Sequence, residues 1–213
     1  MLRRRTALSA LATAAVLFSA PLLTSCGTPH AGAAAVVGGR QITVNTVQAR
    51  VAAVRAAQEK SPQADQLIEA SSDLQRNTVH SLVQARVIER AAKDAGVSVT
   101  PREVQQARRA AEMQAGGKQQ LEAQVLQTYA MIPADIDESI RTDLLMQKVA
   151  AHYGANVQSP EGQTTLLTVL RRTADRLDID VNPRYGKWNA QKLTLDTTKD
   201  PWLSEVSAPE AGA

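Results

Sequence analysis

The sequence predicts a mainly α-helical domain of about six helices, with a small two- or three-stranded sheet formed by its N- and C-terminal segments. Three observations support this fold class. Apolar residues recur every three or four positions between residues 44 and 177. Aromatic residues make up only 3% of the chain, so Ala, Val, Leu and Ile must build the core, which favours closely packed helices. Strand-like patterns occur only at the two ends of this region.

The first elements follow from local signals. Residues 36–42 are predicted to form a short strand or hairpin, because Gly38-Gly39 is a turn signal within an apolar stretch. Thr43 is suited to cap a first helix. Four valines then share one helical face: Val44, Val47, Val51 and Val54. Residues 59–71 are predicted to be a loop or a weak short helix.

The second helix is the predicted centre of the domain. It spans about residues 72–95, and Gly96 ends it. Two apolar stripes run along opposite sides, one with Leu74, Leu82, Ala85, Ile88 and Ala92, the other with Val79, Val83, Val87 and Ala91. A helix that is apolar on two sides packs on both, so we expect this helix to lie between other elements.

The later helices have equally clear signals. Thr100 and Glu103 match a capping box, and Pro101 stands at the first helical position, which predicts a third helix to about Ala115. Helical periodicity continues at about residues 118–130, 133–153 and 160–177. The period then changes, and strand or extended structure is predicted around residues 179–181 and 185–195.

The N-terminus has the three parts of an export signal. Arg3, Arg4 and Arg5 precede an apolar stretch over residues 6–23, and Leu23-Thr24-Ser25-Cys26 follows, with Gly27 next. This arrangement resembles the lipobox of bacterial lipoproteins. Residues 1–25 are therefore predicted to be a lipoprotein signal peptide, and Cys26 to carry the lipid.

Two alternatives for this segment are weaker. A transmembrane anchor of about 18 apolar residues could just span a bilayer, but Pro21 interrupts its end and no positive flank follows. An intramolecular disulfide is excluded because Cys26 is the only cysteine. Arg4-Arg5 leaves a twin-arginine export route open beside the general one.

The predicted domain organisation follows from this signal. Residues 26–35 are expected to be the lipidated cysteine and a flexible tether, because they are small and turn-prone. Residues 36–196 are predicted to form the helical domain, and residues 197–213 a mobile C-terminal tail. Stable membrane attachment takes about two lipid chains, which a diacylglyceryl group on Cys26 supplies.

The charge of the chain argues against a nucleic-acid partner. The chain has 24 Lys plus Arg and 21 Asp plus Glu. Three of the arginines lie in the predicted signal peptide, which holds no acid, so the mature charges balance. No strong basic cluster remains to bind a phosphate backbone. Arg108-Arg109 and Arg171-Arg172 are short pairs that are expected to be solvated helix surface.

The order of motifs resembles the N-terminal chaperone module of SurA and, more loosely, the foldase PrsA. The segments that carry the resemblance are 37–43, 82–97, 99–104, 136–145 and 181–188. They read V-G-G-R-Q-I-T, L-V-Q-A-R-V-I-E-R-A-A-K-D-A-G-V, V-T-P-R-E-V, I-D-E-S-I-R-T-D-L-L and V-N-P-R-Y-G-K-W. Together they cover roughly residues 36–188.

The resemblance implies an ATP-independent holdase, a chaperone that holds unfolded exported polypeptides near the extracytoplasmic face of the cell membrane. The alternative is a scaffold or assembly lipoprotein with one dedicated partner. Many family members carry a parvulin-type prolyl isomerase domain of roughly 90 residues, for which this chain has no room after Tyr153. We therefore expect no enzymatic activity.

No catalytic, metal-binding or cofactor-binding residues are predicted. His80 and His152 are isolated, and Asp178 and Asp180 are expected to be solvated strand surface. Two groups could touch a client chain, although packing in the core is the favoured interpretation for both: Met113, Met131 and Met146, and Tyr185 and Trp188.

Overall fold

The computed structural model of the protein describes residues 32–197. The helices in this range are α1 (Val44–Gln58), α2 (Ala64–Ala70), α3 (Leu74–Asp94), α4 (Pro101–Ala115), α5 (Lys118–Tyr129), α6 (Ile136–His152) and α7 (Pro160–Arg176). The strands are β1 (Ala33–Val37), β2 (Arg40–Thr43), β3 (Asp180–Val181), β4 (Lys187–Asn189) and β5 (Thr194–Asp196). Two short 3-10 helices, Pro133–Asp135 and Pro183–Tyr185, complete the described part. The predicted mainly helical fold class is confirmed.

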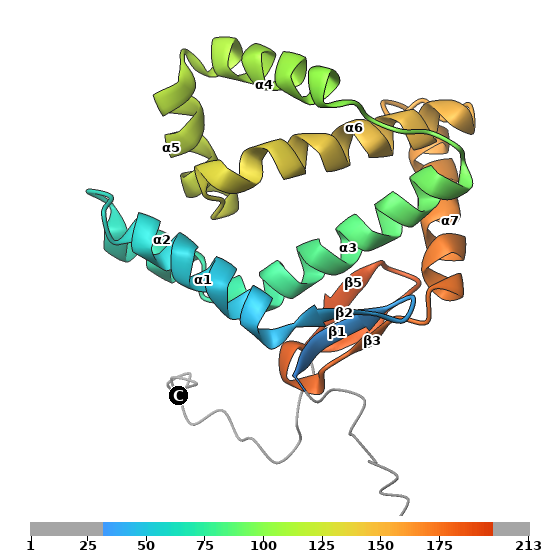
Figure 1. The fold of residues 1–213 in the computed structure, drawn as a ribbon, viewed down its shortest axis with the longest axis horizontal. Helices are drawn as coiled ribbons and strands as arrows, with labels where there is room; N and C mark the ends of the chain where they lie inside the picture. Colours follow the sequence, from blue (N-terminus) through green and yellow to red (C-terminus); the bar gives the residue numbers. More distant parts are fainter. Residues whose placement is uncertain (1–31, 198–213) are drawn as a thin grey trace, which may run out of the picture.

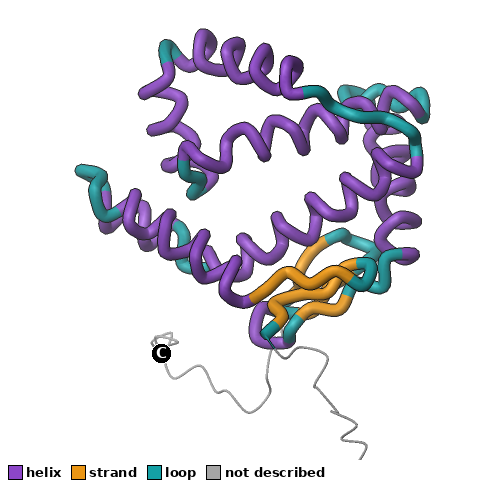
Figure 2. The backbone as a smooth tube through the Cα atoms, in the orientation of Figure 1, coloured by secondary structure: helices purple, strands orange, loops and turns teal. Residues whose placement is uncertain are grey.

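The helices form two arms around the long helix α3 (Figure 1). One arm consists of α1 and α2, and the other of α4, α5 and the first half of α6. The strands lie together at the base of α3, where α1 begins, and α7 packs along the C-terminal half of α3 (Figure 2). This arrangement leaves the middle of the molecule bordered by both arms.

Helix α3 is the centre of the main core, as predicted. Val79 and Val83 are fully buried, and Val87 is nearly so. This stripe belongs to a core that α6, α7 and the strands complete, with Leu145 and Leu170 among its members. The opposite stripe is buried less completely, because Leu82 and Ala85 are only half-buried. The two stripes of α3 therefore have different environments.

The two ends of the domain meet in one sheet, as predicted. Its strand order is β2-β1-β3, and both pairings are antiparallel. The turn between β1 and β2 is Gly38-Gly39, whose φ angles of 57° and 73° suit the tight hairpin turn that glycine favours. The Gly38 amide also donates to the carbonyl of Leu177 at 2.6 Å, which ties the turn to the end of α7.

The sheet corrects one predicted boundary. Residues 26–35 were expected to form a flexible tether, but β1 begins at Ala33, and Ala33, Ala34 and Ala35 are fully buried. Their methyl side chains are small enough for β1 to pack directly under α3. Residues 26–31 of the predicted tether, including Cys26, lie outside the described residues, as does the predicted tail beyond residue 197.

Local signals predicted most element ends correctly. The Thr43 hydroxyl accepts from the Thr46 amide at the start of α1. The capping box of α4 is complete, since Thr100 and Glu103 bond each other's backbone amides. Residues 59–71 contain the short helix α2. Helix α3 begins at Leu74 with Asp73 as its N-cap, two residues later than the predicted start at about residue 72.

A smaller second core holds together the arm formed by α4, α5 and the first half of α6. Leu121 and Val125 of α5 pack against Ile136 of α6. Arg108 of α4 links the same arm, because its guanidinium donates to Asp137 at 2.7 Å and to Glu112 at 3.0 Å. These bonds hold the pKa of Arg108 above its usual range. This arginine therefore has a structural role and is not a free surface cation.

Candidate functional site

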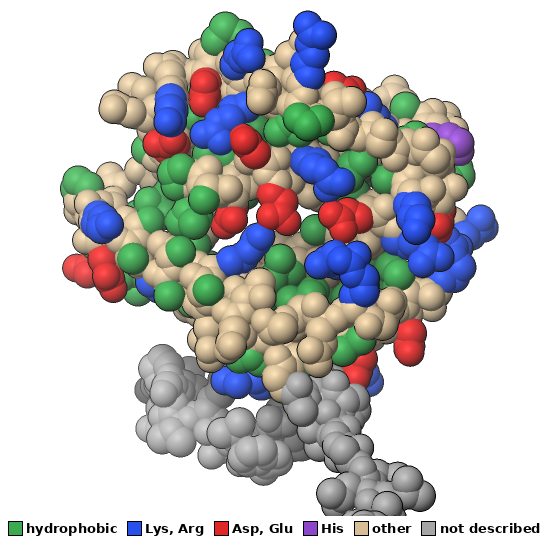
Figure 3. Space-filling view, viewed as in Figure 1, with side chains coloured by type: hydrophobic (Ala, Val, Ile, Leu, Met, Phe, Trp, Pro, Cys, Tyr) green, Lys and Arg blue, Asp and Glu red, His purple; other side chains and the backbone are tan. Residues whose placement is uncertain are grey.

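The main cavity of interest is a groove between the two arms, which we call the central groove. Its volume is about 320 Å³, and α1, α3, the end of α5 and the first half of α6 line it. The apolar side chains in it include Val54, Leu74, Leu82, Ala85, Ile88 and Met146. Figure 3 shows the hollow near the middle of the face, with acidic and basic side chains at its border.

The apolar wall of the central groove is the second stripe of α3. Leu82, Ala85 and Ile88 recur at helical spacing and all line it. The opposite stripe is sealed in the main core, whereas this stripe is buried at Ile88 and Ala92 and only half-buried at Leu82 and Ala85, where α3 borders the cavity. The predicted two-sided packing of this helix is therefore confirmed, with its second side left partly open at Leu82 and Ala85.

The rim of the central groove is charged. Arg50 of α1 reaches across to α6, where its guanidinium lies 2.7 Å from Glu138 Oε2 and 3.7 Å from Asp135 Oδ1. Further out, the Gln127 amide of α5 donates to the Gln63 side-chain oxygen at 3.0 Å. These exposed polar contacts join the two arms.

One acid in the groove has a distinct environment. Asp143 of α6 lines the groove between the two arms. Water reaches its side chain, yet surrounding protein replaces part of its hydration, and this burial raises the pKa of its carboxyl. No hydrogen bond or ion pair joins Asp143 to any of the residues that the structure describes. It is an exposed acid that lines the groove and has no partner among residues 32–197.

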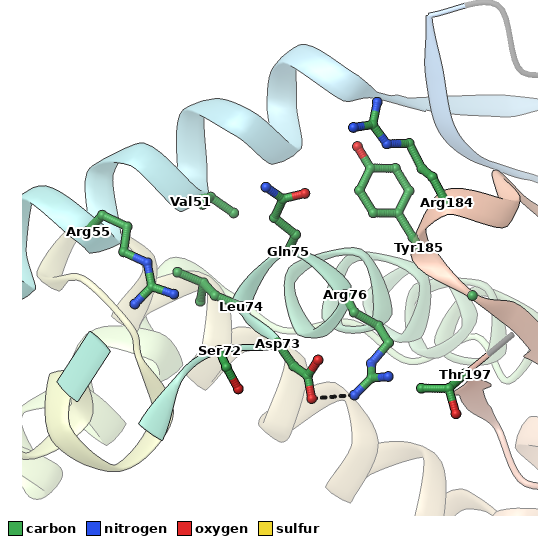
Figure 4. A pocket seen from close by; sticks show the side chains of 11 residues that line it. Val51, Arg55, Ser72, Asp73, Leu74, Gln75, Arg76, Arg184, Tyr185 and Thr197 are labelled. Carbon is green, nitrogen blue, oxygen red and sulfur yellow. Dashed lines mark hydrogen bonds and ion pairs between the residues drawn. The ribbon is translucent and has the colours of Figure 1, made fainter. Parts of the chain in front are cut away.

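A second pocket, of about 390 Å³, lies on the sheet side of α1 and α3 (Figure 4). Its arginines are committed to structural contacts. Arg55 donates to Ser71 Oγ at 2.8 Å and to the Ser71 carbonyl at 2.7 Å, Arg76 pairs with Asp73, and Arg184 covers the buried Tyr185 ring at 5.3 Å. This pocket is lined mostly by polar groups, so the central groove is the better candidate for an apolar ligand.

The structure separates the residues that the sequence left ambiguous. Met131 and Met146 line the central groove, whereas Met113 lies on α4 away from it, with 77% of its surface exposed. Tyr185 is buried, and Trp188 packs against the main core, so both serve the fold. The same holds for His80, whose ring nitrogen bonds the Leu193 carbonyl at 3.0 Å.

Sequence reasoning missed two features of the site. The contact between Arg50 and Glu138 joins residues 88 positions apart, and no local pattern announces it. The isolation of Asp143 depends likewise on the arrangement of α1, α3 and α6. The sequence gives one related signal, the group of acids at the start of the fifth predicted helix: Asp135, Asp137 and Glu138. Acids in this position also interact favourably with the positive end of the helix dipole.

No metal site or membrane span is found within residues 32–197. No group of three or more His, Cys, Asp or Glu side chains in that range could hold a metal ion. No helix there is both long and apolar enough to cross a bilayer. Asp178 and Asp180 do not form the expected common strand surface, because Asp178 precedes β3 and has a positive φ of 46°.

Comparison with known families explains this architecture. A profile described as the SurA-like N-terminal domain matches residues 2–150, which is well over half of the chain. The protein belongs to the SurA-like N-terminal domain family. Domains of this family are non-catalytic, extracytoplasmic modules that occur in periplasmic chaperones. The matched range contains α1 to α5 and nearly all of α6, and so every element of the central groove.

The rest of the described chain lies beyond the matched range. Helix α7 completes the main core, strand β3 completes the three-stranded sheet, and β4 and β5 pair in a two-stranded sheet of their own. A search of curated proteins and a search of solved structures found no match.

Proposed function

We propose that this SurA-like protein is a membrane-anchored, extracytoplasmic holdase that binds unfolded exported polypeptides in the central groove without ATP. The observation that carries the proposal is the apolar stripe of Leu82, Ala85 and Ile88, which lines an open cavity on a helix whose other side is fully packed. An accessible apolar surface with a polar rim is typical of an interaction site. Family membership supports the same function.

The dimensions of the groove favour a short, extended segment as its occupant. A volume of about 320 Å³ is at the lower end of the range for ligand pockets, roughly 300–1,000 Å³. Such a space accepts a few side chains and excludes a folded domain. Met131 and Met146 add flexible walls that adapt to different side chains. These properties suit a protein that holds many unrelated clients.

Binding should be weak. An unfolded client loses conformational entropy when it is held, and we expect dissociation constants of about micromolar or weaker. The mature chain has no large excess of either charge to steer one class of client. Salt should therefore change the affinity much less than it does at a polybasic site.

The anchor in this proposal is the lipid on Cys26. Residue 26 precedes β1 by only a few positions, so the sheet end of the domain would face the membrane while the arms point away from it. Two acyl chains are enough for stable attachment, at about 0.8 kcal/mol for each buried methylene.

The proposed activity involves no catalysis. Only residues 153–159 connect α6 with α7, the place where related chaperones carry an isomerase domain. A proline-containing peptide should therefore relax at its uncatalysed rate in the presence of the protein, over roughly 10–100 s at 25 °C.

The test is suppression of client aggregation, followed by light scattering during refolding of an unrelated protein. The full chain in detergent should suppress scattering without ATP. Leu82→Asp should lose this effect, and Leu167→Asp, at an exposed position of α7, should keep it. Ala85→Trp fills the groove without adding charge and should also lose it.

Two outcomes would count against the proposal. Absence of suppression at several-fold molar excess would exclude a general holdase. Recovery of one stoichiometric partner from native membranes, in place of many unrelated exported chains, would favour the dedicated scaffold.

A further inference from the structure

The charges of the central groove are unevenly distributed. Three acids line it from the α6 side, Asp135, Glu138 and Asp143, and one cation, Arg50, lines it from α1. Arg50 is already engaged with two of these acids, at 2.7 Å from Glu138 and 3.7 Å from Asp135. Asp143 is thus the acid in the groove without a cationic neighbour.

The Asp143 side chain is exposed to water in the groove, and no described residue neutralises its charge. A client that covers the groove would remove this carboxylate from water, which is unfavourable unless a cation or several hydrogen-bond donors compensate for it. No described residue compensates Asp143, although the neighbouring acids pair with Arg50. An incoming positive charge would compensate Asp143 and would find apolar contacts beside it on Ile88 and Met146.

We propose that the central groove prefers client segments in which a Lys or Arg stands next to apolar residues, with the cation paired to Asp143 and the apolar neighbours on the α3 stripe. This inference rests on the proposed holdase function and adds the chemical class of the preferred client. Charge complementarity with Asp143 favours a cationic side chain in the client, and the apolar wall of α3 favours apolar residues next to it.

A metal ion is a poorer occupant of the same position. Cations such as Ca²⁺ take six to eight oxygen ligands, and no group of three or more potential ligands occurs among residues 32–197. Asp135 and Glu138 point to Arg50, which leaves a single carboxylate for the metal. A client ammonium or guanidinium needs only that one partner.

The experiment compares two labelled peptides that differ at one central position, Lys or Gln, within the same apolar sequence. Fluorescence anisotropy gives their dissociation constants for the full chain in detergent. The Lys peptide should bind about fivefold more tightly, as expected for one partly exposed ion pair. Asp143→Asn should abolish this preference. Asp143→Lys should instead bind a third peptide, which has Glu at the central position, more tightly than the Lys peptide.

A matched variant separates this effect from general electrostatics. Asp175 is an exposed acid of α7 outside the groove, so Asp175→Asn should keep the fivefold preference. Equal binding of the Lys and Gln peptides by the unmodified protein, with aggregation suppression intact, would overturn the cation preference and leave the holdase function standing. Failure of both peptides to bind, with no suppression, would overturn both.

Discussion

The contact between Arg50 and Glu138 provides a quantitative prediction, because it joins the two arms across the groove without being part of either core. The guanidinium lies 2.7 Å from the carboxylate, but the two side chains are 31% and 52% exposed. Exposed ion pairs of this kind contribute about 0.2–1 kcal/mol to stability. Arg50→Ala should therefore lower the thermal midpoint by no more than about 4 °C.

The same substitution should have a larger effect on the groove than on stability. Loss of Arg50 frees Glu138 and Asp135 for a client cation and releases one of the contacts that join the arms. We expect tighter binding of the Lys peptide. We also expect a broader distance distribution between spin labels at positions 59 and 118, measured by pulsed electron paramagnetic resonance in a Cys26→Ala background.

Arg176 offers a matched control for this prediction. Its guanidinium lies 2.8 Å from Asp94 and links α7 to α3 away from the groove, with similar exposure. Arg176→Ala should give a comparable change in the thermal midpoint and no change in label distances or peptide affinity. If Arg50→Ala lowered the midpoint far more than Arg176→Ala, or left distances and affinity unchanged, the role given to Arg50 in joining the arms and engaging the acids of the groove would be wrong.

Three further predictions concern the rest of the chain. Gly162→Ala should destabilise the protein by about 1–3 kcal/mol, because the new Cβ would lie 1.9 Å from the Asn156 carbonyl oxygen; a thermal midpoint that rises, as helix propensity alone predicts, would refute this. Bonds from Lys148 and Thr100 lower the pKa of Glu103 from 4.5 to about 2. Its stabilising contribution is therefore present above pH 4.5 and lost as the pH falls towards 2, so the midpoints of the unmodified protein and Glu103→Gln should differ at neutral pH and converge in acid; a constant difference would contradict the assignment. Cys26→Ala should abolish labelling of the protein by a fatty-acid analogue in cells, and a labelled variant would exclude the lipobox interpretation.

The helices could be predicted from the sequence because their signals are local. Thr43 caps α1, and the capping box of Thr100 and Glu103 starts α4, each through contacts within one turn. The pairing of the two ends of the domain, β1 with β3, was also predictable, since strand patterns occur only there. The resemblance to the SurA N-terminal module rests on short local motifs of the same kind, so the family could be predicted from the amino-acid sequence as well.

The parts that the sequence did not reveal depend on distant or unusual contacts. The hairpin of β4 and β5 has no Gly in its turn; instead Asn189 Oδ1 accepts from the amides of Gln191 and Lys192, and Leu193 has a φ of 55°. Gln58 resembles helix surface but is fully buried, where its amide bonds Leu67 and Ser71. The central groove arises from four helices, so neither its walls nor its charges have a local signature.

The central claim is that unfolded clients bind in the groove beside α3, and site-specific photocrosslinking in cells tests it most directly. A photoreactive amino acid is placed at position 82 or 146 in the groove, or at the exposed position 167 of α7. The account predicts crosslinks to many exported chains from positions 82 and 146 and few from position 167. Equal crosslinking at all three positions, or crosslinks from position 167 alone, would contradict it.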